Sequence, residues 1–341
     1  MHRKLTIAAF VCAVAAGTAA VAFAKPPSSS STGTGRVFVS NPVEDLGDQS
    51  LRDQKDSDAA VPASAYHSVV LTDLDGSGYL RGRWATIVSE TGSPAYSPTN
   101  TFNFTRSQDE FEQVMGYYWI TESQKYIQSL GFGSQLRPVN MESQSLRINQ
   151  WGIDNSFATT HKDEIRLGKG GVDDAEDGEV ITHEYGHAIH FSQNFAFASV
   201  EAGAISEGFG DYWAVTMTQV VRQKLGLPPL KDPACVADWD ATSYDPTPPH
   251  CLRRVDSNLH YPENLVGQVH ADGRIWSRAL WDIRNALGNV RADTVILEGQ
   301  FDFAGTTMTQ LAGATVEAAN RLYGSRVARD VRRAFQDRGI L

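Results

Sequence analysis

The sequence HEYGH occupies residues 183–187, and it decides the fold and the chemistry that we predict for this chain. Residues four apart lie on nearly the same face of an α-helix, so His183 and His187 can both bind one Zn²⁺. Glu184 lies beside them, where its carboxylate can take a proton from a water molecule. This HExxH pattern is typical of zinc hydrolases. The motif therefore predicts a helical zinc site with a glutamate base.

A third protein ligand is needed, and Glu207 in the segment SEGFGD can supply it from a second helix. Two histidines and one glutamate leave a coordination position open for water and substrate. Asp211 follows one helical turn later, where it can orient a ligating histidine. The alternative is an ordinary helix with two satisfied histidines, because so short a motif also occurs by chance. Both segments are largely apolar, however, and buried histidines and carboxylates need partners such as a metal.

Residues 105–288 resemble the thermolysin-like and fungalysin-like gluzincin peptidases. Nineteen residues separate His187 from Glu207, which is the thermolysin-type spacing. AGAISEG around that glutamate is similar to the family's SGAINEA segment, and VHADGRIWSRALWDI at residues 269–283 is similar to its VHxNSGI helix. The resemblance implies that His183, His187 and Glu207 are the zinc ligands and that Glu184 is the base. It also implies that Asp211 orients a ligand and that His270 is the oxyanion donor.

The resemblance also implies residues that bind substrate. The family holds the substrate backbone with an Asn-Ala pair on the edge strand above the zinc, and the match here is Asn155 and Ser156. An edge strand can hold a peptide through its unpaired backbone groups. The family's substrate-binding arginine is matched by Arg253, with Arg254 as an alternative. The competing interpretation of Asn155 and Ser156 is an ordinary turn. The competing interpretation of either arginine is a surface charge.

The chain departs from the family at two positions near the expected oxyanion. Ala198 stands where thermolysin-like members have a tyrosine that assists the oxyanion, and Leu265 stands where an aspartate often orients the histidine donor. The alternative for His270 is an ordinary histidine at the start of a helix. Either another tyrosine serves or His270 works with less help, and three tyrosines are candidates for the donor if His270 is not: Tyr212, Tyr244 and Tyr261.

Composition limits the classes of partner. The chain has 341 residues, of which 41% are hydrophobic and 21% charged, values that are ordinary for a globular protein. Its length suffices for one large or two modest domains. The formal net charge of −10 argues against nucleic acid or an anionic membrane surface as a partner. We expect a peptide or protein substrate and a monomeric protein.

The N-terminus has the features of a secretory signal. A basic start precedes an apolar run over residues 5–23, and AFA at residues 22–24 fits a cleavage site. We expect a signal peptide over residues 1–24, cleavage near Ala24, and secretion to the extracellular space or the periplasm. A membrane anchor is the competing interpretation, since the run approaches spanning length. Its alanine content and the Pro- and Ser-rich segment behind it favour the signal peptide, and thus no stable membrane anchor.

Two cysteines follow this segment, Cys235 and Cys251. An even pair that closes a short loop in an exported protein predicts a disulfide. Two free thiols, or a second metal site that includes His250, are the alternatives.

Five carboxylates lie in GVDDAEDGE, residues 171–179, directly before the HEYGH helix. Acidic residues at a helix N-terminus interact favourably with the helix dipole, which explains them without a ligand. The sharper hypothesis is a Ca²⁺ site, because thermolysin-like members carry a calcium ligand at the position of Glu179. Their other calcium ligands do not map here, since Thr218 stands where a glutamate would be.

We expect an α+β fold of two lobes, the thermolysin-like gluzincin arrangement, with the zinc in the cleft between them. Residues 25–65 are expected to form a disordered linker or a short pro-segment. Residues 66–195 would be a β-rich N-terminal lobe that ends in the HEYGH helix, and residues 196–341 an α-helical C-terminal lobe. Alternating apolar and polar residues around DGSG predict a β-hairpin over residues 66–90.

These features predict a secreted zinc-dependent endopeptidase in which the metal activates a water molecule and Glu184 is the general base. A metallo-exopeptidase of the same ligand geometry would need a group that captures a terminal amine, and no such motif stands out. The third possibility is a catalytically silent zinc-binding cleft protein. Ala198 and Leu265 favour it, whereas Glu184 opposes it, because a zinc site without catalysis does not need the base.

Overall fold

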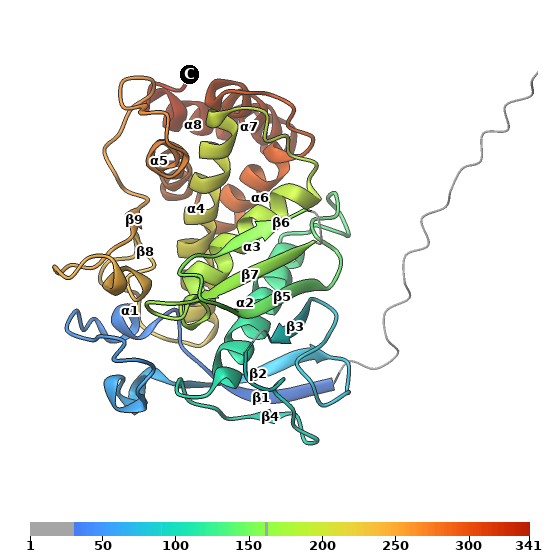
Figure 1. Ribbon diagram of the computed structural model, residues 1–341. Helices are drawn as coiled ribbons and strands as arrows, with labels where there is room; N and C mark the ends of the chain where they lie inside the picture. Colours follow the sequence, from blue (N-terminus) through green and yellow to red (C-terminus); the bar gives the residue numbers. More distant parts are fainter. Residues whose placement is uncertain (1–30, 90, 161–162) are drawn as a thin grey trace, which may run out of the picture.

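The computed structural model describes residues 31–89, 91–160 and 163–341 (Figure 1). The expected signal peptide over residues 1–24 and its cleavage site near Ala24 lie outside the described residues. Sheets occupy the N-terminal half and helices dominate the C-terminal half, so the fold is α+β, as the sequence predicts. Among the described residues, no helix combines the length and the apolar character that crossing a bilayer requires.

The described helices and strands alternate with loops, the longest of which lies between Lys224 and Val269 and holds only short elements. The helices are α1 (Pro42–Leu46), α2 (Asp109–Ser129), α3 (Gly178–Ser192), α4 (Val200–Lys224), α5 (Val269–Leu287), α6 (Asn289–Gln300), α7 (Met308–Tyr323) and α8 (Ser325–Gln336). The strands are β1 (Ser31–Val37), β2 (His67–Leu74), β3 (Ala85–Ser89), β4 (Thr101–Phe102), β5 (Gln144–Trp151), β6 (Phe157–Thr159), β7 (Glu164–Lys169), β8 (Cys235–Val236) and β9 (Arg253–Arg254). Short 3₁₀ turns are η1 (Asp58–Ala60), η2 (Ala63–Ala65), η3 (Asp174–Glu176) and η4 (Asp240–Ser243).

A three-stranded sheet of order β2-β1-β4 lies at one end of the molecule (Figure 1). β1 is its central strand, antiparallel to β2 and parallel to β4. The expected disordered linker is therefore wrong for residues 31–65. The reason is the apolar run Val37, Phe38 and Val39, whose side chains are fully buried. Burial of such a run offsets the entropy lost when the segment becomes ordered.

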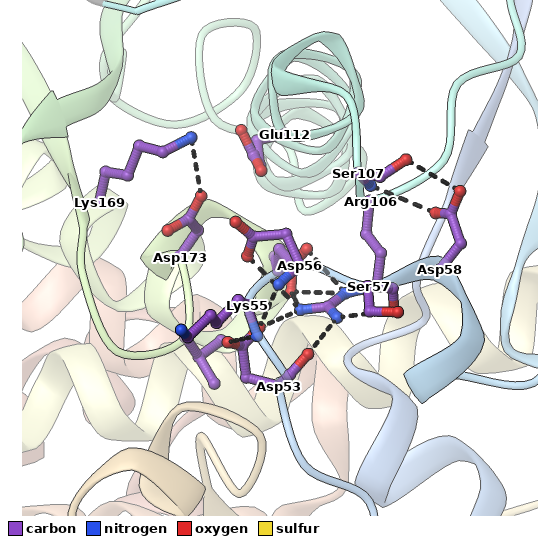
Figure 2. Close-up of polar contacts among 12 residues, drawn as sticks. Asp53, Lys55, Asp56, Ser57, Asp58, Arg106, Ser107, Glu112, Lys169 and Asp173 are labelled. Carbon is purple, nitrogen blue, oxygen red and sulfur yellow. Dashed lines mark hydrogen bonds and ion pairs between the residues drawn. The ribbon is translucent and has the colours of Figure 1, made fainter.

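One buried guanidinium, that of Arg106, holds residues 53–58 against the rest of the fold (Figure 2). Arg106 donates hydrogen bonds to the backbone carbonyls of Asp53 at 2.7 Å and Ser57 at 3.2 Å. It also donates to the carboxylate of Glu176 at 2.7 Å. A buried charge requires this degree of pairing. The network ties the N-terminal segment to the acidic run that precedes α3.

A four-stranded sheet of order β3-β5-β7-β6 lies between the first sheet and the C-terminal helices (Figure 1). β3, β5 and β7 are parallel, and β6 runs antiparallel to β7 along one edge, with Ala158 opposite Ile165. The predicted hairpin is confirmed only next to its turn, where Leu74 and Gly82 form one antiparallel bridge, and β2 and β3 themselves belong to different sheets. The chain does reverse at DGSG, where Asp75 donates its amide to the carbonyl of Arg81 at 2.9 Å. β3 then leaves β2 to pair with the buried strand β5.

α3 carries the HEYGH motif and packs against α4, which packs in turn against α5. Two glycines on α4 permit the close approach of these helices. A Cβ atom at Gly210 would lie 2.7 Å from Nδ1 of His183, and one at Gly208 would lie 2.3 Å from the carbonyl oxygen of Gly273 on α5. Larger residues at these positions would push the helices apart. The proposed boundary between two lobes at residue 195 falls in the connection between α3 and α4.

Cys235 and Cys251 form the predicted disulfide, with Cα atoms 5.5 Å apart. The bridge lies beside the short antiparallel pair of β8 and β9. The loop that it closes carries η4, and β9 follows the second cysteine at once. Arg253 and Asp240 are thus attached to a covalently closed loop.

Candidate active site

His183 and His187 project from one face of α3, with ring centroids 5.0 Å apart. Both rings direct Nε2 at Glu207 on α4. His183 Nε2 lies 3.3 Å from Oε2 of Glu207, and His187 Nε2 lies 3.7 Å from its Oε1. The candidate ligand atoms of these three residues lie within 4.8 Å of one another. The structure thus brings together the three ligands that the sequence suggests.

Protein groups occupy the other ring nitrogens. Asp211 Oδ1 lies 2.9 Å from Nδ1 of His183, and Ser206 Oγ lies 2.7 Å from Nδ1 of His187. Such contacts fix the ring orientation and leave Nε2 free for a ligand. The sequence analysis did not predict that Ser206 contacts His187. The only indication in the sequence was the position of Ser206 next to Glu207.

Arg253 lines the cavity and is bound to Asp211 through two parallel contacts, Nε to Oδ2 at 2.8 Å and Nη2 to Oδ1 at 2.7 Å. Burial would raise the pKa of Asp211, but the charges of Arg253 and His183 outweigh it and hold that pKa below its usual range. Arg254, the alternative, pairs instead with Asp232 at 2.6 Å. Arg253 therefore holds the carboxylate that orients His183, whatever contact it makes with substrate.

The charges of the donor set suit a metal. Burial opposes a charge on His183, but its hydrogen bonds with Asp211 and Glu207 outweigh burial and raise its pKa to about 10. Burial lowers the pKa of His187 to about 4. Burial would raise the pKa of Glu207, but the hydrogen bond from His183 and nearby positive charges lower it to about 2. The carboxylates thus favour a positive charge at the point where the three donors converge.

Glu184 follows His183 on α3, is buried and lines the cavity. Its Oε2 has no hydrogen-bond partner among the described residues. Burial raises the pKa of Glu184 to about 7, with the charge of Glu207 adding to the rise and that of His183 opposing it. A carboxyl group with a pKa near neutrality suits general-base chemistry.

A cavity of about 1100 Å³ opens in front of these groups. The edge strand β6 forms one wall, and Asn155 and Ser156 just before it also line the cavity. His270 on α5 lines it from the C-terminal half, so the cavity lies between elements of both halves of the chain. Its shape and its exposed strand edge could accommodate an extended peptide.

His270 lies in the first turn of α5, with its Nε2 3.3 Å from Oε2 of Glu207. Its Nδ1 lies 2.9 Å from the amide nitrogen of Gln268. The sequence left this ring without a partner because Leu265 replaces the expected aspartate. Gln268, which caps α5, fills that role, and its place two residues before His270 was the signal that we missed.

The structure separates the three tyrosines that could assist an oxyanion. Tyr212 is fully buried and bound to Asp293, and Tyr261 lines a different pocket. Tyr244 lines the main cavity and donates to Asp154 at 2.9 Å. Only Tyr244 of these three therefore lies in the cavity that contains the ligand set.

The acidic run before α3 is buried, and its residues reach other parts of the chain. Glu179 accepts hydrogen bonds from Thr218 at 2.8 Å and from the amide of Ala237 at 2.7 Å. Burial and repulsion from neighbouring carboxylates raise the pKa of Glu179 and, to about 8, that of Asp238. The helix-dipole explanation covers Asp177, which caps α3, but does not explain why so many carboxylates are buried together.

The fold is shared with a solved metalloproteinase. That structure is the precursor of protealysin, a metalloproteinase from Serratia proteamaculans, to which this chain is similar with a TM-score of 0.50 and 17% sequence identity, over 67% of this chain and 79% of that one. A scan against protein-family models finds no match, and a search of curated proteins finds none. At this identity the likeness concerns the fold: the α+β architecture is one that a metalloproteinase uses.

Proposed function

We propose that this protein is a secreted, zinc-dependent endopeptidase in which Glu184 is the general base. The observation that carries the proposal is the convergence of His183 and His187 on Glu207, beside Glu184, whose Oε2 has no hydrogen-bond partner among the described residues. The likeness of the fold to a metalloproteinase supports it. The disulfide supports an exported protein, since disulfides persist outside the reducing cytosol.

The donor set fits zinc. Two imidazole nitrogens and one carboxylate are ligands that Zn²⁺ prefers, and Asp211 and Ser206 hold the opposite ring nitrogens of the two histidines. A bound zinc ion supplies a Lewis acid that makes a water molecule nucleophilic at neutral pH.

Side chains of this protein would carry out the proton transfer, the stabilisation of the oxyanion and the binding of the peptide. Glu184 accepts the proton of the attacking water and passes it to the leaving amine. His270 faces the same carboxylate as the ligand histidines, and its Nε2 can donate to the carbonyl oxygen as that oxygen becomes negative. β6 offers an unpaired strand edge to the peptide backbone, with Asn155 and Ser156 at its start. Arg253 keeps Asp211 in place beside His183.

One observation favours a second candidate, an exopeptidase of the same ligand geometry. Three carboxylates, those of Asp154, Asp174 and Asp240, line the same cavity and could take a terminal amine. A catalytically silent zinc-binding protein has no comparable support, because it does not need Glu184.

Zinc analysis followed by digestion of an unstructured protein tests the proposal. The purified protein is expected to contain about one equivalent of zinc and to produce internal cuts, which mass spectrometry identifies. Glu184→Gln is the matched control, since it keeps the size of the side chain and removes the base. Stepwise loss of terminal residues would instead indicate an exopeptidase, and bound zinc without any cuts a silent protein.

A further inference from the structure

Three carboxylates gather at one side of the candidate active site and form an acidic recess, which we define as Asp154, Asp174 and Asp240. Asp154 precedes β6, Asp174 lies in η3, and Asp240 lies in η4. One oxygen from each lies within 4.8 Å of the others. All three line the cavity that also contains Glu184 and His183. The recess is therefore part of the space that a peptide on β6 would enter.

The recess lacks a positive partner within the part of the chain that the structure describes. Asp174 accepts from the hydroxyl of Ser156 and from the amide of Gly168, and Asp154 accepts from Tyr244 at 2.9 Å. These are neutral donors. No lysine, arginine or histidine of the described residues forms an ion pair with Asp154, Asp174 or Asp240.

Asp240 is the least satisfied member of the recess. Its side chain is only 5% exposed, and its Oδ1 has no hydrogen-bond partner among the described residues. A buried carboxylate oxygen without a partner carries a desolvation cost that a cation would remove. Arg253, the one lysine or arginine among the described residues that line the cavity, is already bound to Asp211.

The electrostatics of the recess agree with this geometry. Burial raises the pKa of Asp174 to about 7, and the charges of Asp154 and Glu184 add to the rise. Burial and the charges of its neighbours also raise the pKa of Asp240, although Arg253 opposes them. A positive group between these carboxylates would stabilise their ionised forms.

We propose that the acidic recess binds the cationic side chain of a lysine or arginine next to the cleaved bond, so that the enzyme selects basic substrates. The inference rests on the proposed peptidase function. Asp154 directly precedes Asn155 and the strand edge that would hold the backbone, and side chains of an extended peptide alternate in direction. One side chain of such a peptide would point into the recess. Because Asp154 is exposed, the recess is open to a long side chain from the cavity.

The first experiment identifies cleavage sites in an unfolded protein digested by the zinc-loaded enzyme. Lysine or arginine is expected at one constant position within about two residues of most cuts. A peptide that spans a frequent cut is then synthesised with arginine or with citrulline, which has the same shape and no charge. We expect kcat/KM to favour arginine on the order of tenfold or more, because a buried charge pair is lost with citrulline.

Variants assign this preference to the recess. Asp240→Asn and Asp174→Asn keep the side-chain volume and should reduce the ratio of kcat/KM for the arginine peptide to that for the citrulline peptide towards one. Asp330→Asn, an exposed aspartate on α8, is the matched control and should keep the preference. Asp240→Asn breaks no side-chain hydrogen bond recorded among the described residues, so it remains informative if Asp174→Asn fails to fold.

A binding measurement separates this inference from the proposed function. Glu184→Gln protein is titrated with short, labelled, N-acetylated peptides that differ only in arginine or citrulline, and fluorescence anisotropy is recorded. Tighter binding of the arginine peptide, lost in Glu184→Gln/Asp240→Asn, supports the recess even if no cleavage is found. Cleavage without a basic preference overturns the inference and leaves the peptidase intact. If the protein shows no cleavage and no selective binding, both the peptidase function and the role of the acidic recess are overturned.

Two other cations could fill the recess, and each gives a different result. Calorimetry measures whether Ca²⁺ binds and whether that binding disappears in Asp240→Asn. If it does, and the arginine preference is lost in saturating Ca²⁺, the recess is a metal site and the inference is overturned. Cleavage that requires a free N-terminus and stops on acetylation would identify a terminal-amine site, which overturns the inference and favours the exopeptidase.

Discussion

The side-chain amide nitrogen of Gln268 lies 2.9 Å from Nδ1 of His270. The amide oxygen of Gln268 accepts a hydrogen bond from the backbone N–H of Ala271, so the group that faces the ring is the NH₂. An NH₂ group donates, which makes Nδ1 the acceptor and places the ring hydrogen of neutral His270 on Nε2. Nε2 is the atom that faces Glu207 and the cavity. Gln268 therefore prepares His270 as a hydrogen-bond donor without requiring it to be charged.

Gln268→Ser tests this positioning role. Serine still caps α5, so the free energy of unfolding should change little, but it cannot reach Nδ1 of His270. We expect kcat to fall roughly tenfold, with KM and bound zinc little changed, because a donor that acts in the transition state is disturbed. His270→Ala should lower kcat at least as much. Steady-state kinetics with zinc analysis check this, and unchanged kcat in both variants would remove His270 from the mechanism.

Glu184→Gln tests the base. Glutamine keeps the shape of the side chain and lacks the proton acceptor, so hydrolysis should fall by roughly 100-fold or more. Zinc content should be unchanged, since Glu184 is not one of the converging donors. Initial rates and metal analysis measure the two quantities. Activity comparable to that of the parent would show that another group accepts the proton.

Glu207→Ala and Asp211→Asn distinguish a ligand from the residue that orients one. Glu207→Ala should lose zinc affinity and activity together, because it removes one of three donors. Asp211→Asn should lower zinc affinity less, about 10- to 100-fold. It should also destabilise the fold, because Arg253 would keep a buried charge without a counterion. Competition with a chelator gives the affinities. Parental zinc affinity in Glu207→Ala would contradict the ligand set.

The pH dependence of stability should reflect the buried carboxylates around Asp173 (Figure 2). Burial and the charge of Asp56 raise the pKa of Asp173 to about 6, whereas Lys169 at 3.4 Å opposes the rise. The unfolded value is about 3.9. The folded state holds this proton more tightly, so the stabilising contribution is complete below about pH 4 and is lost as pH rises through 6.

Urea unfolding between pH 4 and pH 8 measures that contribution. As pH rises across this range, the free energy of unfolding of Asp173→Asn should increase relative to that of the parent by on the order of 1–3 kcal/mol, because asparagine does not ionise. Glu317→Gln, an exposed substitution on α7, should have a curve of unfolding free energy against pH that is parallel to that of the parent. A parallel curve for Asp173→Asn would show that Asp173 is already ionised at pH 4.

Calcium binding at Glu179 remains a prediction from the family resemblance, and Glu179 lies among the buried carboxylates of Glu44, Asp177 and Asp238. Carboxylate oxygens are ligands that Ca²⁺ prefers. Added Ca²⁺ should raise the midpoint of thermal unfolding in proportion to the logarithm of its concentration above Kd. Glu179→Gln should abolish that rise, while Asp330→Asn should keep it. An unfolding midpoint that does not respond to Ca²⁺ or to its chelation would contradict the site.

The local part of the site could be predicted from the sequence, because helical periodicity places His183, Glu184 and His187 before any tertiary contact is known. Glu207 was predicted as a carboxylate on a second apolar helix, and the spacing of a known family supports that choice. Gln268 and Ser206 were not predicted, since their roles depend on how closely α4 and α5 approach α3. That approach is set by glycines whose importance no single helix reveals. The acidic recess joins three separate turns and likewise has no signature in one segment.

Fold class was predictable, whereas the pairing of strands was not. The polar, glycine-containing sequence of Ser31–Val37 resembles a linker, and its order comes from the strands on both sides and from the apolar residues that follow. The turn at residues 75–78 was recognised, but the partner of β3 lies more than fifty residues away in β5. Local turn chemistry fixes a reversal of the chain and does not decide which strand is adopted as neighbour.

The central place of β1 limits how far the chain could be trimmed from its N-terminal side without loss of the fold. A cut before Ser31 leaves the sheet of β2, β1 and β4 whole, whereas a cut after Val37 would separate β2 from β4 and expose the paired edges of both. Trimming that preserves the fold must therefore stop ahead of Ser31. Ser31–Val37 therefore belongs to the folded body of the protein, since its removal would cost the sheet its central strand.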